Sequence, residues 1–171
     1  MKCFILSIFL GSFMLNLFNH NAYCQEKLVT SLPVSSLSSY SLENKIPKEV
    51  SKYLGIPYRR GGSSRSGVDC SGFVRLIYKN IFRVDLPYIA SYQSRLPIFE
   101  NVSLRELRTG DLVFFSPITN KKRINHVGIY LSDSSFAHAI ESKGVIISSL
   151  DNKYWKARVT SIKRIKSNDF L

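Results

Sequence analysis

Cysteine and histidine are both scarce in this chain, whose 171 residues contain three of each. Cys3 and Cys24 lie within an N-terminal leader or at its end, which leaves Cys70 as the single side-chain thiol of the folded domain. Exported proteins usually pair their cysteines, so a lone thiol is a candidate reactive group. His20 also lies in the leader, and two remaining histidines with one cysteine are too few to predict a zinc site. We therefore expect neither a metal nor another cofactor.

Long apolar runs are missing apart from one, from Phe4 to Phe18. This run follows Lys2 and is too short for a stable membrane span, which is typical of a secretory signal. We assign residues 1–24 to a signal peptide, because Ala22 and Cys24 place small residues at the −3 and −1 positions. Cys24 could instead become a lipidated N-terminus, which would associate the protein with a membrane. Either way the expected location is the periplasm or the cell envelope.

Acidic residues are also few, with 12 Asp and Glu against 24 Lys and Arg, for a formal net charge of +12. Removal of the leader takes away only Lys2, so a charge of about +11 remains. The sequence contains no recognised nucleic-acid motif, and an exported protein rarely meets nucleic acid, so we expect no such partner. A polyanionic cell-wall polymer suits this charge better. A basic surface that is merely solvated is the simpler alternative.

The segment 67–78 predicts a loop that becomes a helix at Cys70. Asp69 is a good N-cap, and apolar residues then recur at helical spacing, at Phe73, Leu76, Ile77 and Ile81. In the first turn, unpaired N–H groups and the helix dipole favour a thiolate, so a lowered pKa is expected for Cys70. A buried structural cysteine is the alternative. The glycine-rich segment 61–67 immediately before the helix favours the reactive interpretation.

The order of the remaining elements predicts an α+β domain. Residues 25–46 are rich in serine and indicate a flexible lead-in, and the domain is expected over 47–171. Its first helix should run from Pro47 to Leu54, and another short helix is expected within 88–96. Strands are expected at 112–115, 127–131, 136–140, 144–150 and 159–165. Helices followed by antiparallel strands should pack on one side of a sheet.

His126 and His138 fall in the two strands of a predicted hairpin. If the loop is the three-residue segment 132–134, position 128 faces 138, and both imidazoles project from one face, with Cα atoms roughly 7–8 Å apart. A loop with an even number of residues would put them on opposite faces. The other face of the first strand carries Val127, Ile129 and Leu131. We expect both imidazoles to point at the first turn of the cysteine helix, because a thiolate needs a general base and that base needs an orienting group.

Several ordered motifs resemble those of the NlpC-type cell-wall peptidases. They are Tyr-Arg-Arg-Gly-Gly at 58–62, Gly-Val-Asp-Cys-Ser-Gly-Phe-Val at 67–74, Arg-Thr-Gly-Asp-Leu-Val-Phe-Phe at 108–115 and His-Val-Gly-Ile-Tyr-Leu at 126–131. The segments 136–139 and 144–150, with Tyr154-Trp155 beyond them, are similar to the branch that contains the murein endopeptidases of the Gram-negative envelope. The resemblance covers about 47–165, which is nearly the whole expected domain.

This resemblance implies a papain-like fold reduced to its core, with a Cys–His–His catalytic set. Cys70 would be the nucleophile and His126 the general base. His138 would orient His126 through the ring nitrogen that does not face the thiol. Tyr58 corresponds to an aromatic residue whose hydroxyl helps to hold substrate or oxyanion. We place it with Asp69 and Ser71, which flank the cysteine, among the candidate substrate and oxyanion residues.

The implied function is that of an exported cysteine endopeptidase whose substrate is peptidoglycan. The bond hydrolysed would be the D-Ala–diaminopimelate crosslink or the γ-D-Glu–diamino acid bond of the stem peptide. Arg60, Tyr88 and Ile89 depart from the family pattern and are expected to affect specificity rather than the reaction. Two alternatives remain: a wall-binding module without activity, and a secreted lysin or toxin that uses the same chemistry.

Overall fold

A computed structural model describes residues 34–166, with side chains from Ser41 onward. The expected signal peptide at 1–24 and the first part of the expected lead-in, 25–33, lie outside the described residues. Cys3, His20 and Cys24 lie outside them for the same reason. Within the described range, no helix has both the length and the apolar character needed to cross a membrane.

The first described element is helix α2, Val34–Ser51, with Pro47 inside it. The flexible interpretation is therefore wrong for residues 34–46, and the helix begins well before the predicted start at Pro47. Ile46 and Val50, four residues apart, are both buried in the main core, which gives this end of the helix a packed face. Tertiary packing of such a face stabilises a helix whose own sequence period is weak. The helix ends at Ser51, and Gly55, with φ of 79°, lies in the turn that follows.

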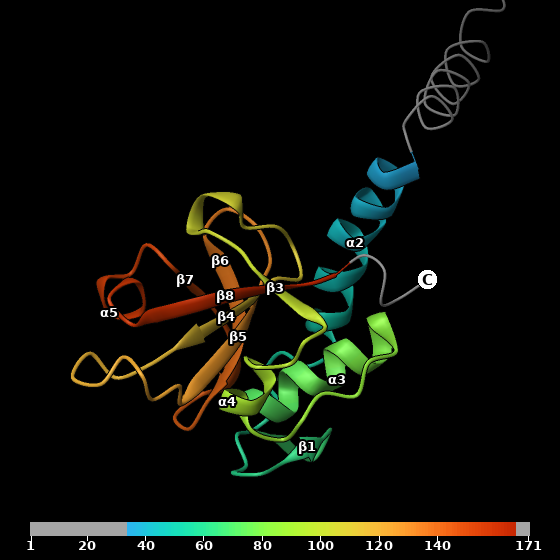
Figure 1. The fold of residues 1–171 in the computed structure, drawn as a ribbon. Helices are drawn as coiled ribbons and strands as arrows, with labels where there is room; N and C mark the ends of the chain where they lie inside the picture. The colour runs from blue at the N-terminus through green and yellow to red at the C-terminus, as the bar shows by residue number, and fades with distance from the viewer. Residues whose placement is uncertain (1–33, 167–171) are drawn as a thin grey trace, which may run out of the picture. The chain divides into compact units, whose positions relative to one another are not determined.

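Helix α3, Cys70–Phe82, begins at the predicted residue. Its N-cap is Asp69, whose side chain accepts a hydrogen bond from the Gly72 N–H, and the helix ends before Arg83, which has a φ of 62°. The buried face of α3 packs against strands β5 and β6 of the sheet. Figure 1 shows α3 and the shorter α4, Ala90–Gln93, beside the strands. The prediction of an α+β fold, with N-terminal helices packed on an antiparallel sheet, is confirmed.

The sheet has six antiparallel strands in the order β3-β8-β4-β5-β6-β7. The bounds are β3 Phe99–Asn101, β4 Leu112–Phe115, β5 His126–Tyr130, β6 Ser135–Ile140, β7 Gly144–Ser149 and β8 Val159–Ile165. Five of these strands match predictions to within one residue at each end. Strand β3 was not predicted, and neither were the β1–β2 pair, Ser63–Ser64 with Gly67–Val68, and helix α5, Lys153–Lys156. A short 3₁₀ helix, Leu104–Glu106, precedes β4.

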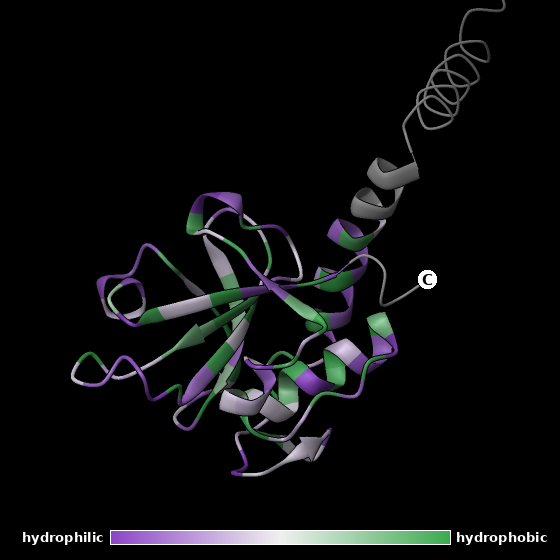
Figure 2. Ribbon diagram, viewed as in Figure 1, coloured by the Kyte–Doolittle hydropathy of each residue, from purple (hydrophilic) through white to green (hydrophobic). Residues whose placement is uncertain are grey.

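Each face of the sheet carries its own core. Leu112 and Phe114 of β4 belong to the core that α3 covers, whereas Val113 and Phe115 belong to the core on the other face. Because successive side chains alternate between faces, a strand buried on both sides is apolar throughout. The hydropathy colouring of β4 in Figure 2 shows this continuous apolar run. The second core contains Phe136, and Trp155 of α5 packs against it.

Candidate active site

The turn that carries Cys70 is organised by the carboxylate of Asp69. Oδ1 of Asp69 accepts hydrogen bonds from the Gly72 N–H at 2.7 Å and from the Ser71 hydroxyl at 2.9 Å, and Oδ2 accepts one from the Gly61 N–H at 2.8 Å. A Cβ on Gly72 would lie 2.0 Å from the Gly62 carbonyl oxygen, so the glycine loop contacts the helix start directly. Asp69 and Ser71, expected in the substrate and oxyanion set, thus use these polar atoms to hold the turn together.

The Cys70 side chain is 9% exposed and is a free cysteine. Backbone N–H groups of Cys70, Ser71 and Val127 face the sulfur and favour its anionic form. Burial outweighs them and, with the negative charge of Asp69, raises the pKa of the Cys70 thiol to about 11. The expected lowering of this pKa is therefore wrong, because the dipole effect of the helix start is smaller than the cost of desolvation. At neutral pH the group is a thiol.

The hairpin that carries the two histidines has the predicted geometry. Ile129 pairs with Ala137 and the N–H of Leu131 bonds to the Ser135 carbonyl, so the loop contains three residues, 132–134. This register places both imidazoles on one face. Nε2 of His126 lies 2.8 Å from Nδ1 of His138, and the ring planes are almost perpendicular at 85°.

The histidine face is not the face that α3 covers, which corrects the expected orientation. Val127 and Ile129 are fully buried in the same core as Cys70 and the apolar residues of α3. The physical reason is that Val127 and Ile129 form part of the apolar surface on which α3 packs, while the opposite face of the sheet packs against Trp155 of α5 in the second core. The sulfur lies close to the backbone at the beginning of β5, because the Val127 N–H faces it and the nitrogen of Val127 is two covalent bonds from the His126 Cα.

On their own face, the imidazoles lie among aromatic rings. Trp155 stacks on His126 with ring centroids 5.3 Å apart and an interplanar angle of 24°, and it meets His138 edge-on at 4.6 Å. Phe136 lies 4.6 Å from His138, and Phe115 lies 5.8 Å from His126. The sequence motif that contains Trp155 does not by itself indicate a role for this residue. In the structure it covers the histidine pair.

Burial in this aromatic environment keeps both imidazoles neutral. It lowers the pKa of His138 to about 3, and the proximity of His126 adds to the effect. Burial also lowers the pKa of His126 to about 4, although the carboxylate of Asp69 acts in the opposite direction. The second ring nitrogen of His138, Nε2, lies 2.8 Å from Oγ of Ser148, a residue that sequence reasoning did not identify.

Tyr58 is half-buried beside the cysteine turn and pairs with Val68 through an isolated bridge. Burial raises the pKa of its hydroxyl, with further contributions from Cys70 and Asp69, which places these groups close to the phenol. Tyr88 is 58% exposed, and its carbonyl accepts a hydrogen bond from the Ser71 hydroxyl at 2.7 Å.

Ile89 is 52% exposed and follows Tyr88 directly, while Arg60 is exposed on the glycine loop. These departures from the family pattern therefore border the cysteine turn.

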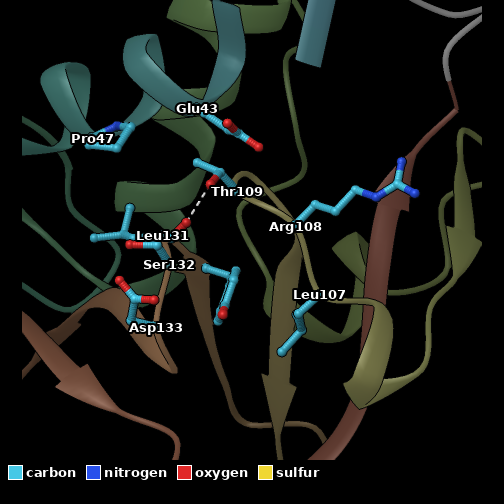
Figure 3. A pocket seen from close by; sticks show the side chains of 9 residues that line it. Glu43, Pro47, Leu107, Arg108, Thr109, Leu131, Ser132 and Asp133 are labelled. Carbon is cyan, nitrogen blue, oxygen red and sulfur yellow. Dashed lines mark hydrogen bonds between the residues drawn. The ribbon is translucent and has the colours of Figure 1, made fainter. Parts of the chain in front are cut away.

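A separate cavity of about 370 Å³ lies at the other end of β5 from His126. Figure 3 shows its lining, where the Thr109 hydroxyl donates a hydrogen bond to the Leu131 carbonyl. Its nine lining residues are Glu43, Pro47, Leu107, Arg108, Thr109, Tyr130, Leu131, Ser132 and Asp133. None of them is a candidate catalytic residue. Within residues 34–166, no group of three or more His, Cys, Asp or Glu is arranged to hold a metal ion.

A cysteine at the start of a helix, packed on an antiparallel sheet, defines this chain as a papain-like α+β domain. The model of the NlpC/P60 family matches residues 55–164, and the chain belongs to this family, whose members are cysteine peptidases. The resemblance inferred from the motifs is thereby confirmed.

Three relatives indicate the range of the family. The chain is 39% identical over 126 residues to "Murein DD-endopeptidase MepS/Murein LD-carboxypeptidase" of Escherichia coli (strain K12), which covers 74% of this chain and 64% of the relative. It is 42% identical over 117 residues to "Probable endopeptidase NlpC" of the same strain, and this match covers 68% of this chain and 74% of that relative. It is 39% identical over 120 residues to "Gamma-DL-glutamyl hydrolase" of Bacillus subtilis (strain 168), and this match covers 70% of this chain and 28% of that relative. The match thus spans less than two thirds of the first relative.

Solved structures show the same fold. An NlpC/P60 family protein from Bacillus cereus superposes with a TM-score of 0.66 at 29% identity, covering 72% of this chain and 40% of that one. The NlpC/p60 domain of the peptidoglycan hydrolase SagA superposes with a TM-score of 0.58 at 28% identity, covering 72% and 97%.

Proposed function

We propose that this protein is an exported cysteine endopeptidase that hydrolyses amide bonds in peptidoglycan stem peptides or their crosslinks. The observation that carries the proposal is the hydrogen-bonded pair of His126 and His138, together with a free cysteine at a helix start whose sulfur faces the N–H of Val127, the residue after His126. The bond is the D-Ala–diaminopimelate crosslink or the γ-D-Glu–diamino acid bond. Relatives named as a murein DD-endopeptidase and as a gamma-DL-glutamyl hydrolase support this substrate class.

The reaction begins from a neutral thiol and a neutral imidazole. Because Nε2 of His126 is engaged by His138, Nδ1 is the nitrogen that takes the proton from Cys70 as the sulfur attacks the carbonyl. The resulting imidazolium donates its Nε2–H to Nδ1 of His138. The backbone N–H of Cys70, at the helix start, is the proposed donor to the oxyanion. His126 then protonates the leaving amine. It next takes a proton from a water molecule that attacks the thioester carbonyl; the C–S bond breaks, the acid is released, and the proton returns to the sulfur of Cys70.

The remaining candidate residues support this chemistry without taking part in bond exchange. The proposed role of the Tyr58 hydroxyl is to hold the substrate carbonyl or the oxyanion, and its proximity to Cys70 supports this role. Exposed basic residues within the glycine-rich segment 61–67 and just before it, Arg59, Arg60 and Arg65, attract the anionic wall. Export follows from the signal-like segment at 1–24, with lipidation at Cys24 as the alternative route to the envelope.

The test is digestion of purified sacculi followed by mass spectrometry of the fragments. Wild type should convert crosslinked dimers to monomers if the D-Ala–diaminopimelate bond is cut. It should instead release a sugar-linked L-Ala-D-Glu fragment if the γ-D-Glu bond is cut. Cys70→Ala should keep the melting temperature close to wild type and lose activity by about a thousandfold or more. Residual activity within tenfold of wild type would exclude the cysteine mechanism.

The same assay separates the alternatives. A binding module without activity would leave sacculi intact while still sedimenting with them. A lysin or toxin would show the same cleavage but act on intact cells when added from outside.

A further inference from the structure

The hydrogen bond between the two histidines continues to a third side chain. His138 lies in β6, and its Nε2 is 2.8 Å from Oγ of Ser148 in the neighbouring strand β7. Ser148 is paired with Phe136, two residues before His138, so the strand register fixes this contact. The two hydrogen bonds, each 2.8 Å long, connect His126 to Ser148 in one line.

This line has two possible directions, because each neutral imidazole carries one N–H. In one direction the Ser148 oxygen accepts from Nε2–H of His138, Nδ1 of His138 accepts from Nε2–H of His126, and Nδ1 of His126 keeps its lone pair. In the other direction the Ser148 hydroxyl donates, both ring protons move to Nδ1, and Nδ1 of His126 carries a hydrogen. Only the first direction leaves His126 able to take a proton at Nδ1.

We propose that Ser148 is a positioning residue of the hydrolytic site, whose Oγ accepts a hydrogen bond from His138 and thereby holds both imidazoles in the productive tautomers. This inference rests on the proposed roles of Cys70 and His126. Ser148 acts through His138 and does not touch the substrate.

The surroundings of His138 explain why one hydroxyl has this influence. The imidazole is fully buried, so an unpaired N–H would be costly. Its nearest rings, Phe136 and Trp155, both at 4.6 Å, offer no lone pair in their ring planes. Without Ser148, the tautomer that leaves Nε2 unprotonated becomes favourable, because its Nδ1–H still has a partner in His126. That tautomer blocks the general base.

The chain offers a conservative variant and a matched control. Ser148→Thr keeps a hydroxyl at a strand position that suits a β-branched residue. Ser149→Ala removes a hydroxyl from the next residue, which is exposed and projects from the other face of β7. Ser148→Ala should lower kcat by about tenfold to a hundredfold with little change in KM. Ser148→Thr should restore most of kcat, and Ser149→Ala should match wild type.

The decisive readout is the tautomer itself, measured by ¹⁵N NMR of the histidine rings at neutral pH. In wild type, His138 should be protonated at Nε2, and in Ser148→Ala the proton should move to Nδ1. Wild-type protein protonated at Nδ1 of His138 would overturn the proposal, and so would Ser148→Ala with wild-type kcat. This spectrum needs neither the variants to be active nor peptidoglycan to be the substrate. A failure of the proposed function is therefore distinguishable from a failure of the Ser148 assignment.

Discussion

The resting state of Cys70 can be measured directly by alkylation with iodoacetamide across a range of pH. With the thiol pKa raised to about 11, only about one molecule in ten thousand carries a thiolate at pH 7. Free cysteine, with a pKa of about 8.5, carries about 300-fold more thiolate at that pH. The greater nucleophilicity of a more basic thiolate recovers about tenfold of this difference. Cys70 should therefore react roughly 30-fold more slowly than free cysteine at pH 7, before any steric shielding.

The pH profile separates this effect from shielding. Steric shielding lowers the rate equally at every pH, whereas a high pKa makes the rate rise about tenfold per pH unit from 7 to about 10. Asp69→Asn retains a good N-cap residue but removes a negative charge, so the midpoint of its profile should move to lower pH. His126→Ala should leave the rate at pH 7 close to wild type, because a neutral pair has no imidazolium to lose. A profile that levels off by pH 8, or a large loss of rate in His126→Ala, would show that the site rests as an ion pair.

Two further predictions concern the charge and the buried histidines. Binding to sacculi should weaken as salt is raised from low to physiological ionic strength, whereas turnover of a small soluble stem peptide should change much less. Binding that does not depend on salt would mean that the basic residues are only a solvated surface. Because the folded protein binds a proton at His138 only near pH 3 and the unfolded chain does so near 6.5, stability should fall as the pH drops below about 6.5. Between pH 7 and pH 5 this histidine contributes about 2 kcal/mol of that loss of stability. The free energy of unfolding in urea should therefore depend less on pH in His138→Gln than in wild type. An identical pH dependence in the two proteins would refute this linkage.

The elements that the sequence predicted well are those whose signals are local. Asp69 before an apolar pattern of helical spacing defines the start of α3, and both the cap and the helix occur as expected. The four apolar residues of β4 predict a strand buried on both faces, and each is at most 1% exposed. The three-residue loop 132–134 determined the hairpin register, and with it the shared face of the two histidines.

The features that sequence reasoning missed depend on distant contacts. Helix α2 is stabilised where Ile46 and Val50 pack into a core that the serine-rich sequence around them does not reveal. Strand β3 has three residues and exists through its pairing with β8, more than sixty residues later in the chain. The side of the sheet that α3 covers follows from where the apolar residues of β5 lie. Chemical expectations for the histidines suggested the opposite side.

The pKa of Cys70 shows how packing changes a chemical inference made from the sequence. A helix start favours a thiolate only as far as water or polar groups also solvate the charge. Here the glycine loop closes against the first turn of α3, burial of the sulfur outweighs the backbone N–H groups that face it, and the Asp69 carboxylate that caps the helix repels a second negative charge. Burial among the aromatic rings of the other face likewise lowers the basicity of the histidines. Proton transfer from sulfur to imidazole is therefore unfavourable until the sulfur attacks a substrate carbonyl. For this reason the direction of the histidine hydrogen bonds matters more for activity than the fraction of thiolate in the free protein.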